Sequence, residues 1–239
     1  MADRWFEIAS LEHFWIRRRF EVLRRLASHM ISNAKEMAEI GCGHGLLQRQ
    51  IEDCYEREVA GFDLHELPLK QNVSRRSSVF CYDIFQMDPS LRSRFDAIFL
   101  FDVLEHISRE DGFLEALLFH LAPSGKLVIN VPAGQWAYSE YDRKVGHVRR
   151  YSIGTLLDTA GRNGLRVREW TYWGLPLIPT LALRKLWLRV GRNKREVISS
   201  GFEPSSRAIN LMLGLACRCE VIPQRLMGTS LMAILERTD

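Results

Sequence analysis

The sequence contains few cysteines, and none of them forms a pair at metal-binding or redox spacing. The 239 residues include five cysteines, an odd number, with no Cys-x-x-Cys pair and no histidine at zinc-finger spacing. Such a set indicates a reduced chain without a structural metal, and we therefore expect a cytoplasmic protein. The cysteines are Cys42, Cys54, Cys81, Cys217 and Cys219.

Long apolar runs and concentrated charge are also missing. No window approaches the roughly 20 apolar residues of a membrane-spanning helix, and the opening MADRWFEIAS lacks the basic start and apolar run of a secretory signal. The 33 basic and 29 acidic residues are interleaved and give a net charge of +4. This pattern does not favour a dedicated nucleic-acid-binding protein, which shows a dense basic stripe.

Several short apolar runs are spaced as strands of one sheet. Their apolar residues occupy consecutive positions, which is typical of strands buried on both faces, so we expect a parallel sheet covered by helices. With 46% hydrophobic residues, the chain can bury one full core. The runs are EMAEI, EVAGFDL, SVFCYDI, FDAIFLF and KLVINVP.

The remaining segments predict one domain with two elaborations. Residues 1–35 read as a helical cap, residues 36–173 as the core, residues 174–227 as a helical insertion, and residues 228–239 as the last strand of the core. Within the core, IGTLLDTAGRNG predicts a helix and LRVREWTYW a strand. The polar and aromatic stretch AGQWAYSEYDRKVGHVRRYS predicts a long functional connection.

Three alternate glycines, Gly41, Gly43 and Gly45, stand between a predicted strand and a predicted helix. Backbone without Cβ atoms turns tightly and approaches a ligand closely, while the helix N-terminus supplies free N–H groups. Asp63, at the end of the second strand, can accept both hydroxyls of a ribose, and Asp83 ends the third strand. These features predict a site for a nucleotide-like cofactor.

The spacing of the loop separates two classes of cofactor. Nicotinamide enzymes use Gly-x-Gly-x-x-Gly to hold a pyrophosphate, but here the third glycine comes one position early and Glu39 precedes the loop. A carboxylate beside the loop repels a pyrophosphate and favours a cation. S-adenosylmethionine, which carries an α-ammonium and a sulfonium, fits this pattern better.

The ordered set AEIGCGHG, GFDL, FCYDI, RFDAIFLFDVLEHI and LAPSGKLVINVPA resembles the motifs of class I S-adenosylmethionine-dependent methyltransferases over roughly residues 36 to 170. Within that superfamily the sequence is similar to small-molecule enzymes of the ubiquinone-biosynthesis and methyltransferase type 11 and 12 kind, which often carry a stretch like GHVRRYS. The resemblance implies an α/β, Rossmann-like enzyme with S-adenosylmethionine and no metal. It also implies a seven-stranded, mostly parallel sheet whose last strand is antiparallel.

The resemblance also implies cofactor contacts by motif position. Residue 39 and the glycine loop would line the methionine moiety, Asp63 the ribose, and the residues around 83 the adenine, while the residues after the fourth strand would close the pocket. Buried glycines also serve helix packing, and strand-end aspartates also cap turns. Asp96 begins a strand, so we expect it to be structural. The cofactor set is Glu39, Gly41, Cys42, Gly43, Gly45, Asp63, Leu64, Asp83, Ile84, Asp102, Val103 and His106.

Methyl transfer depends mainly on holding nucleophile, carbon and sulfur in line, and a hydroxyl acceptor must also lose a proton. We expect His147 to be the base, with His106 as its rival, although a loop histidine also serves to order its neighbours. Trp15 and Arg19 could cover the pocket or belong to the core, and the charged residues could equally form a solvated face. Acceptor-binding candidates are Tyr138, Tyr141, Asp142, Arg149, Arg150, Tyr151 and His13.

Two questions stay open at this point. Residues 177–195 read either as a lid over the acceptor pocket or as a basic amphipathic helix lying on an anionic membrane. The sequence does not separate a monomer from a homodimer. We expect O-methylation of a small molecule such as a sugar, a polyketide or another secondary metabolite, free or lipid-linked. The alternatives are an N-methyltransferase, an RNA methyltransferase and a non-catalytic scaffold.

Overall fold

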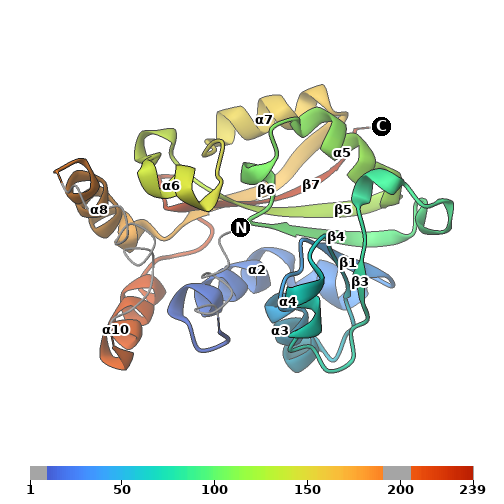
Figure 1. The fold of residues 1–239 in the computed structure, drawn as a ribbon, viewed down its shortest axis with the longest axis horizontal. Coiled ribbons are helices and arrows are strands. Elements are labelled where there is room, and N and C mark those ends of the chain that lie inside the picture. The colour runs from blue at the N-terminus through green and yellow to red at the C-terminus, as the bar shows by residue number, and fades with distance from the viewer. Residues whose placement is uncertain (1–9, 191–205, 239) are drawn as a thin grey trace.

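The computed structural model of the chain describes residues 10–190 and 206–238 (Figure 1). The expected cap and insertion therefore lie partly outside the described residues. Where the chain is described, its seven strands form one sheet in the order β3-β2-β1-β4-β5-β7-β6. They are β1 (Met37–Ile40), β2 (Ala60–Asp63), β3 (Val79–Cys81), β4 (Phe95–Phe101), β5 (Leu121–Pro132), β6 (Leu165–Trp173) and β7 (Ser230–Arg237).

The sheet confirms the expected topology. Neighbouring strands from β3 to β5 run parallel, with Ile40 of β1 level with Phe62 of β2 and with Leu100 of β4. The last strand, β7, lies antiparallel to both β5 and β6. Because β1 has β2 on one side and β4 on the other, the strand order reverses there, and ligands of open α/β sheets bind at such a point.

Helices cover both faces of the sheet, which explains the consecutive apolar residues in its strands. On β4, Ala97, Ile98, Phe99 and Leu100 are all fully buried, and alternate residues face two separate hydrophobic clusters. Figure 1 shows α2 and α3 below the sheet and α5 and α7 above it. The described helices are α2 (Phe14–Asn33), α3 (Leu46–Tyr55), α4 (Glu66–Lys70), α5 (Glu110–His120), α6 (Glu140–Val145), α7 (Ile153–Arg162), α8 (Ile178–Val190) and α10 (Arg207–Arg218).

The connection after β5 is more regular than the sequence analysis expected. It holds a 3-10 turn, η4 (Gln135–Ala137), and the short helix α6. Ser139 and Asp142 form a capping box at the start of α6, since the Asp142 carboxylate accepts from the Ser139 backbone N–H at 2.9 Å. Ser-x-x-Asp is therefore the signal in the sequence from which this helix start could have been predicted.

The expected insertion contributes α8 and α10, which lie apart from each other beyond the same end of the sheet (Figure 1). Asn210 of α10 joins it to the start of α2, because its Oδ1 accepts from the Phe14 backbone N–H at 2.9 Å. Leu183 on α8 is exposed. The end of the predicted 177–195 segment lies outside the described residues, so its role as lid or membrane contact stays a prediction. Among the described helices, none has the length and apolar character to cross a membrane.

Candidate active site

The glycine loop between β1 and α3 is shaped by the positions of its neighbours. Gly41 has a φ of +76°, and a Cβ atom there would lie 2.4 Å from Cγ2 of Val103. Its N–H donates to the carbonyl of Phe62 at 2.7 Å, and the N–H of Gly43 donates to Oδ2 of Asp63 at 2.9 Å. A side chain at position 41 would therefore be both strained and blocked.

A cavity of about 260 Å³ opens at the carboxyl ends of β1, β2 and β4. Its wall includes every residue of the expected cofactor set except Gly45. Gly45 instead begins α3 with a φ of +72°, and a Cβ atom there would lie 2.3 Å from the Asn72 side chain. The third glycine of the loop is thus needed for packing against Asn72.

A hydrogen-bonded chain fixes the part of the wall formed by Asp102. Arg19 of α2 donates to Oδ2 of Asp102 at 2.6 Å, and Asn130 of β5 donates to Oδ1 at 2.8 Å. Trp173 at the end of β6 donates to Asn130 at 2.9 Å. Asp102 itself has a φ of +57°, an uncommon conformation for a residue with a side chain, which these bonds hold in place.

Glu39 brings a buried carboxylate to the base of the cavity. Only 4% of the residue is exposed, and Oε2 has no hydrogen-bond partner among the described residues. Burial raises the pKa of Glu39 to about 8, and the nearby Arg19 guanidinium opposes that rise only in part. The cavity therefore contains a carboxyl oxygen that has no hydrogen-bond partner among the described residues.

The opposite wall of the cavity is apolar and partly open. Leu64 is 63% exposed and Phe85 is 56% exposed, although both line the cavity, and Ile84 is buried beside them. Asp83 starts the 3-10 turn η1 (Ile84–Gln86) and accepts from the Phe85 N–H at 3.0 Å. Sequence analysis missed Phe85, and also the wall residues Phe62, Tyr82, Ile107 and Phe113, because aromatic and apolar residues at such positions read as core.

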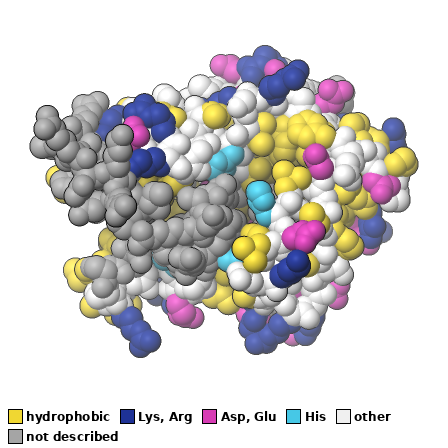
Figure 2. All heavy atoms as spheres, in the orientation of Figure 1, with side chains coloured by type: hydrophobic (Ala, Val, Ile, Leu, Met, Phe, Trp, Pro, Cys, Tyr) yellow, Lys and Arg dark blue, Asp and Glu magenta, His cyan; other side chains and the backbone are white. Residues whose placement is uncertain are grey.

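Two histidines meet beside the cavity, which Figure 2 shows as a hollow in a face bearing histidine and apolar side chains. His106 belongs to the cavity wall, whereas His147 is not part of the wall and packs edge-on against His106, with ring centroids 4.8 Å apart. Burial, and then the charge of His147, lower the pKa of His106 to about 4. His106 is therefore a weak proton acceptor, which favours His147 as the base.

Three of the expected acceptor-binding residues are buried and support His147 or its loop. Asp142 is fully buried and accepts from Nδ1 of His147 at 3.0 Å and from Nε of Arg150 at 2.8 Å. Burial alone would raise the pKa of Asp142, but the His147 hydrogen bond and the Arg150 charge lower this pKa to about 2. The Tyr151 hydroxyl bonds to Glu110. This geometry favours positioning over acceptor contact for Asp142, Arg150 and Tyr151.

The other expected acceptor ligands lie outside the cavity wall. Tyr138 donates to the carbonyl of His147 at 2.8 Å, and Arg149 pairs with Glu110 at 2.7 Å. His13 is buried and caps α2, since its Nδ1 accepts from the Trp15 N–H at 3.2 Å. Tyr141 is half-buried on α6. Acceptor binding by these residues stays a prediction.

The two residues of α2 that could either cover the pocket or belong to the core, Arg19 and Trp15, have different positions. Arg19 lines the cavity, and its guanidinium lies over the rings of Trp15 and Phe101, 5.2 and 5.0 Å from their centroids. Trp15 is buried against Trp173. Asp96 has the structural role expected of it, since its carboxylate accepts from the backbone N–H groups of residues 35 and 36.

The family of the chain follows from a match over most of this fold. The family described as "Methyltransferase domain" matches residues 12–173, a span that includes α2, the glycine loop, Asp63, Asp102 and both histidines. The chain belongs to this methyltransferase family. As a methyltransferase of the class I fold, it uses S-adenosylmethionine as its methyl donor. No curated protein matches the sequence.

Solved structures similar to this methyltransferase share its fold at low identity. An S-adenosylmethionine-dependent methyltransferase from Archaeoglobus fulgidus is 19% identical, with 92% of this chain and 94% of that chain covered and a TM-score of 0.58. The O-methyltransferase of a polyketide synthase from Brevibacillus brevis is 14% identical, with 92% and 72% covered and a TM-score of 0.55. The 1,6-didemethyltoxoflavin-N1-methyltransferase from Burkholderia thailandensis is also 14% identical, with 99% and 82% covered and a TM-score of 0.58. These similarities show the fold. By their names, one of these proteins methylates oxygen and another methylates nitrogen.

Proposed function

We propose that the methyltransferase transfers a methyl group from S-adenosylmethionine to a hydroxyl of a small molecule. The observation that carries the proposal is the pair His106 and His147 beside the cofactor cavity, with His147 held by the buried Asp142. An imidazole fixed by a carboxylate is suited to accept a proton. A hydroxyl acceptor needs that step, whereas a neutral amine can attack with its lone pair.

The cavity fits the donor through groups that the structure leaves available. Glu39 offers the α-ammonium a buried oxygen that has no hydrogen-bond partner among the described residues. Asp63 already accepts from the N–H groups of Gly43 and His65, one on each oxygen, and each oxygen retains a lone pair for a ribose hydroxyl. Leu64 and Phe85 offer apolar area to the adenine. We assign these roles as part of the same proposal.

Glu39 makes donor binding dependent on pH. With a pKa of about 8 in the free protein, its carboxyl carries a proton at neutral pH, and this proton must leave when an ammonium group binds. Affinity for S-adenosylmethionine is therefore expected to increase about tenfold from about pH 6.5 to about pH 8 and then to level off, as measured by calorimetry. Glu39→Gln has no such proton, so its affinity is expected to be nearly flat over this range. An equal rise in the variant would contradict the assigned role.

When bound, the donor supplies an electrophilic methyl group on a sulfonium, so the protein's task is alignment and proton removal. The acceptor oxygen would take the methyl group as the carbon–sulfur bond breaks, and Nε2 of His147 would receive the hydroxyl proton and release it to water. Nδ1 of His147 stays hydrogen-bonded to Asp142, which fixes the ring and stabilises its charged form. His106, whose pKa is about 4, remains neutral beside it.

The test is a transfer assay with matched acceptors. The protein, with radiolabelled S-adenosylmethionine, is given phenols, sugars and polyketide fragments, each next to an analogue whose hydroxyl is replaced by an amine, and a separate sample receives total RNA. We expect label on oxygen, confirmed by NMR of the product. Label only on nitrogen, or only in the RNA, would overturn the proposal and favour the corresponding alternative.

A further inference from the structure

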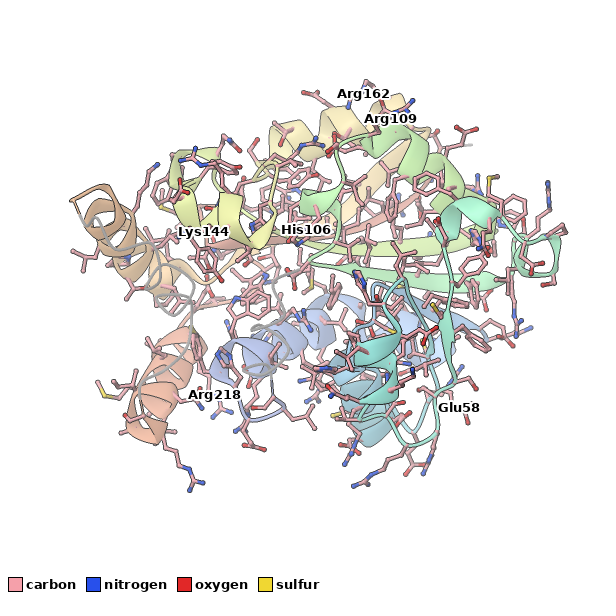
Figure 3. The ribbon with its side chains drawn as sticks, in the orientation of Figure 1. Glu58, His106, Arg109, Lys144, Arg162 and Arg218 are labelled. Atoms are coloured by element: carbon pink, nitrogen blue, oxygen red, sulfur yellow. The ribbon has the colours of Figure 1, made fainter. Side chains whose placement is uncertain are left out.

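A third polar side chain lies with the two histidines, and the proposed function does not use it. Glu105 is 1% exposed and directly precedes His106 in the turn η3 (Leu104–His106). One oxygen or nitrogen from each of Glu105, His106 and His147 lies within 4.8 Å of the other two. In Figure 3, the labelled His106 lies next to the loop that follows α6. That loop carries His147.

In both histidines, Nε2 is the ring nitrogen that is left for a ligand. Nδ1 of His106 lies 3.1 Å from the carbonyl of Gly146, and Nδ1 of His147 lies 3.0 Å from the Asp142 carboxylate. Since a carbonyl and a carboxylate only accept, both Nδ1 atoms carry hydrogen, and both Nε2 atoms keep a lone pair. Histidines that bind metals are held in this way, by a carbonyl or carboxylate on the other ring nitrogen.

One oxygen of the buried Glu105 carboxyl is left without a hydrogen bond in the described part of the chain, although the carboxyl also accepts from its own backbone N–H. Its Oε2 has no hydrogen bond among the described residues, and its Oε1 lies 3.8 Å from Nε2 of His147. That separation is too long for a hydrogen bond, so a protonated Glu105 could not donate to Nε2 of His147 at this distance. The nearest guanidinium groups are already engaged, Arg150 with Asp142 and Arg19 with Asp102. The atoms left for a ligand are therefore one oxygen of a buried carboxyl group and the Nε2 atoms of two imidazoles, a set of groups that a cation can satisfy.

We propose that Glu105, His106 and His147 form a binding site for a divalent transition-metal ion, beside the donor cavity. Two imidazoles and one carboxylate are ligands typical of zinc and of iron(II), and three protein ligands leave positions open for an acceptor oxygen. A tetrahedral ion with bonds of about 2.1 Å keeps its ligand atoms about 3.4 Å apart. Side-chain rotations that draw the three atoms together are therefore part of binding.

The inference rests on the proposed hydroxyl acceptor for its chemical consequence. A hydroxyl bound to such an ion loses its proton to water more readily, because the ion stabilises the resulting oxyanion. In the metal-loaded enzyme both Nε2 atoms are ligands, and the metal activates the acceptor. In the metal-free enzyme that task falls to His147 alone. Sequence analysis expected no metal because it sought cysteine spacing and did not connect residue 105 with residue 147.

Metal binding is tested without any acceptor. The full chain, loaded with S-adenosylhomocysteine, is titrated with Co²⁺ by calorimetry and visible absorption, and with Mg²⁺, which prefers oxygen ligands, for contrast. We expect one Co²⁺ site that Mg²⁺ does not fill, weakened at least 100-fold in Glu105→Gln and His147→Gln. Asp142→Asn leaves all three ligands in place but replaces the carboxylate that holds Nδ1 of His147 and pairs with Arg150, and it is expected to weaken Co²⁺ binding about 10–100-fold.

Matched controls are Glu58→Gln and His29→Gln, both exposed and outside the cluster, and both are expected to bind like wild type. Equal Co²⁺ affinity in Glu105→Gln and wild type, with S-adenosylhomocysteine binding retained in both, would overturn the site. Transfer to the hydroxyl acceptor is then measured after chelation. A loss of at least tenfold that is restored by the ion supports metal activation. Full activity after chelation overturns it and leaves the proposed function intact, whereas absence of any hydroxyl methylation is a failure of the proposed function alone.

Discussion

Replacing His147 by glutamine is expected to reduce turnover on a hydroxyl acceptor by about 10²–10⁴-fold, the usual contribution of a positioned acid–base group. Glutamine can still donate to Asp142 but cannot accept the acceptor's proton. Affinity for S-adenosylmethionine is expected to stay within about threefold of wild type, because His147 lies outside the cavity wall. Single-turnover rates and donor titrations separate the two effects.

His29→Gln provides the matched control, since this histidine is exposed on α2 and remote from the cavity, and its turnover is expected to be unchanged. Asp142→Asn is informative as a second variant. It keeps the shape of the side chain but weakens its hold on Nδ1 of His147, so we expect a smaller loss than in His147→Gln. If His147→Gln turned over like wild type, His147 would have no part in the chemistry.

Asp63→Ala is expected to weaken both S-adenosylmethionine and S-adenosylhomocysteine about 100-fold. Two charge-assisted hydrogen bonds to ribose at about 1.5 kcal/mol each amount to about that factor. The substitution also removes the acceptor for the N–H of Gly43, which holds the glycine loop against β2. Calorimetry with both compounds measures the effect, and the donor and its product should be affected equally because they share the ribose.

Asp53→Ala is the control, because Asp53 is a surface residue of α3 that pairs with Arg49 and does not line the cavity. Its binding of both compounds is expected to equal that of wild type. Asp63→Asn, which keeps one acceptor oxygen, should lie between wild type and Asp63→Ala. Wild-type affinity in Asp63→Ala would show that the ribose is held elsewhere.

The sheet could be predicted from the sequence because its strands are buried on both faces, and that burial leaves a plain signal. After Asp96 at its start, FDAIFLF contains no polar residue, since β4 lies between two hydrophobic clusters. The cavity wall could be predicted in part for a similar reason. Gly41 and Asp63 stand at strand ends, where a parallel sheet brings them to one edge, so chain position alone places them together.

Contacts between distant segments could not be read in this way. Asp142 and Arg150 were expected to bind the acceptor or to lie on a solvated face, yet both are buried and pair with each other. Trp173 was assigned only to a strand, although its indole N–H reaches Asn130. Such pairings depend on how the elements pack, and the neighbouring residues in the sequence do not indicate the partner.

The bonded chain from Arg19 through Asp102 and Asn130 to Trp173 spans three parts of the polypeptide. Trp173 is followed directly by Gly174 and Leu175, whose N–H groups donate to Glu220, just past α10. The pocket is thus built jointly by the first helix, the sheet and the segment before the final strand. A shortened polypeptide without the first 35 residues would leave two acidic groups, Glu39 and Asp102, without their guanidinium neighbour, so the first helix is needed to hold the donor.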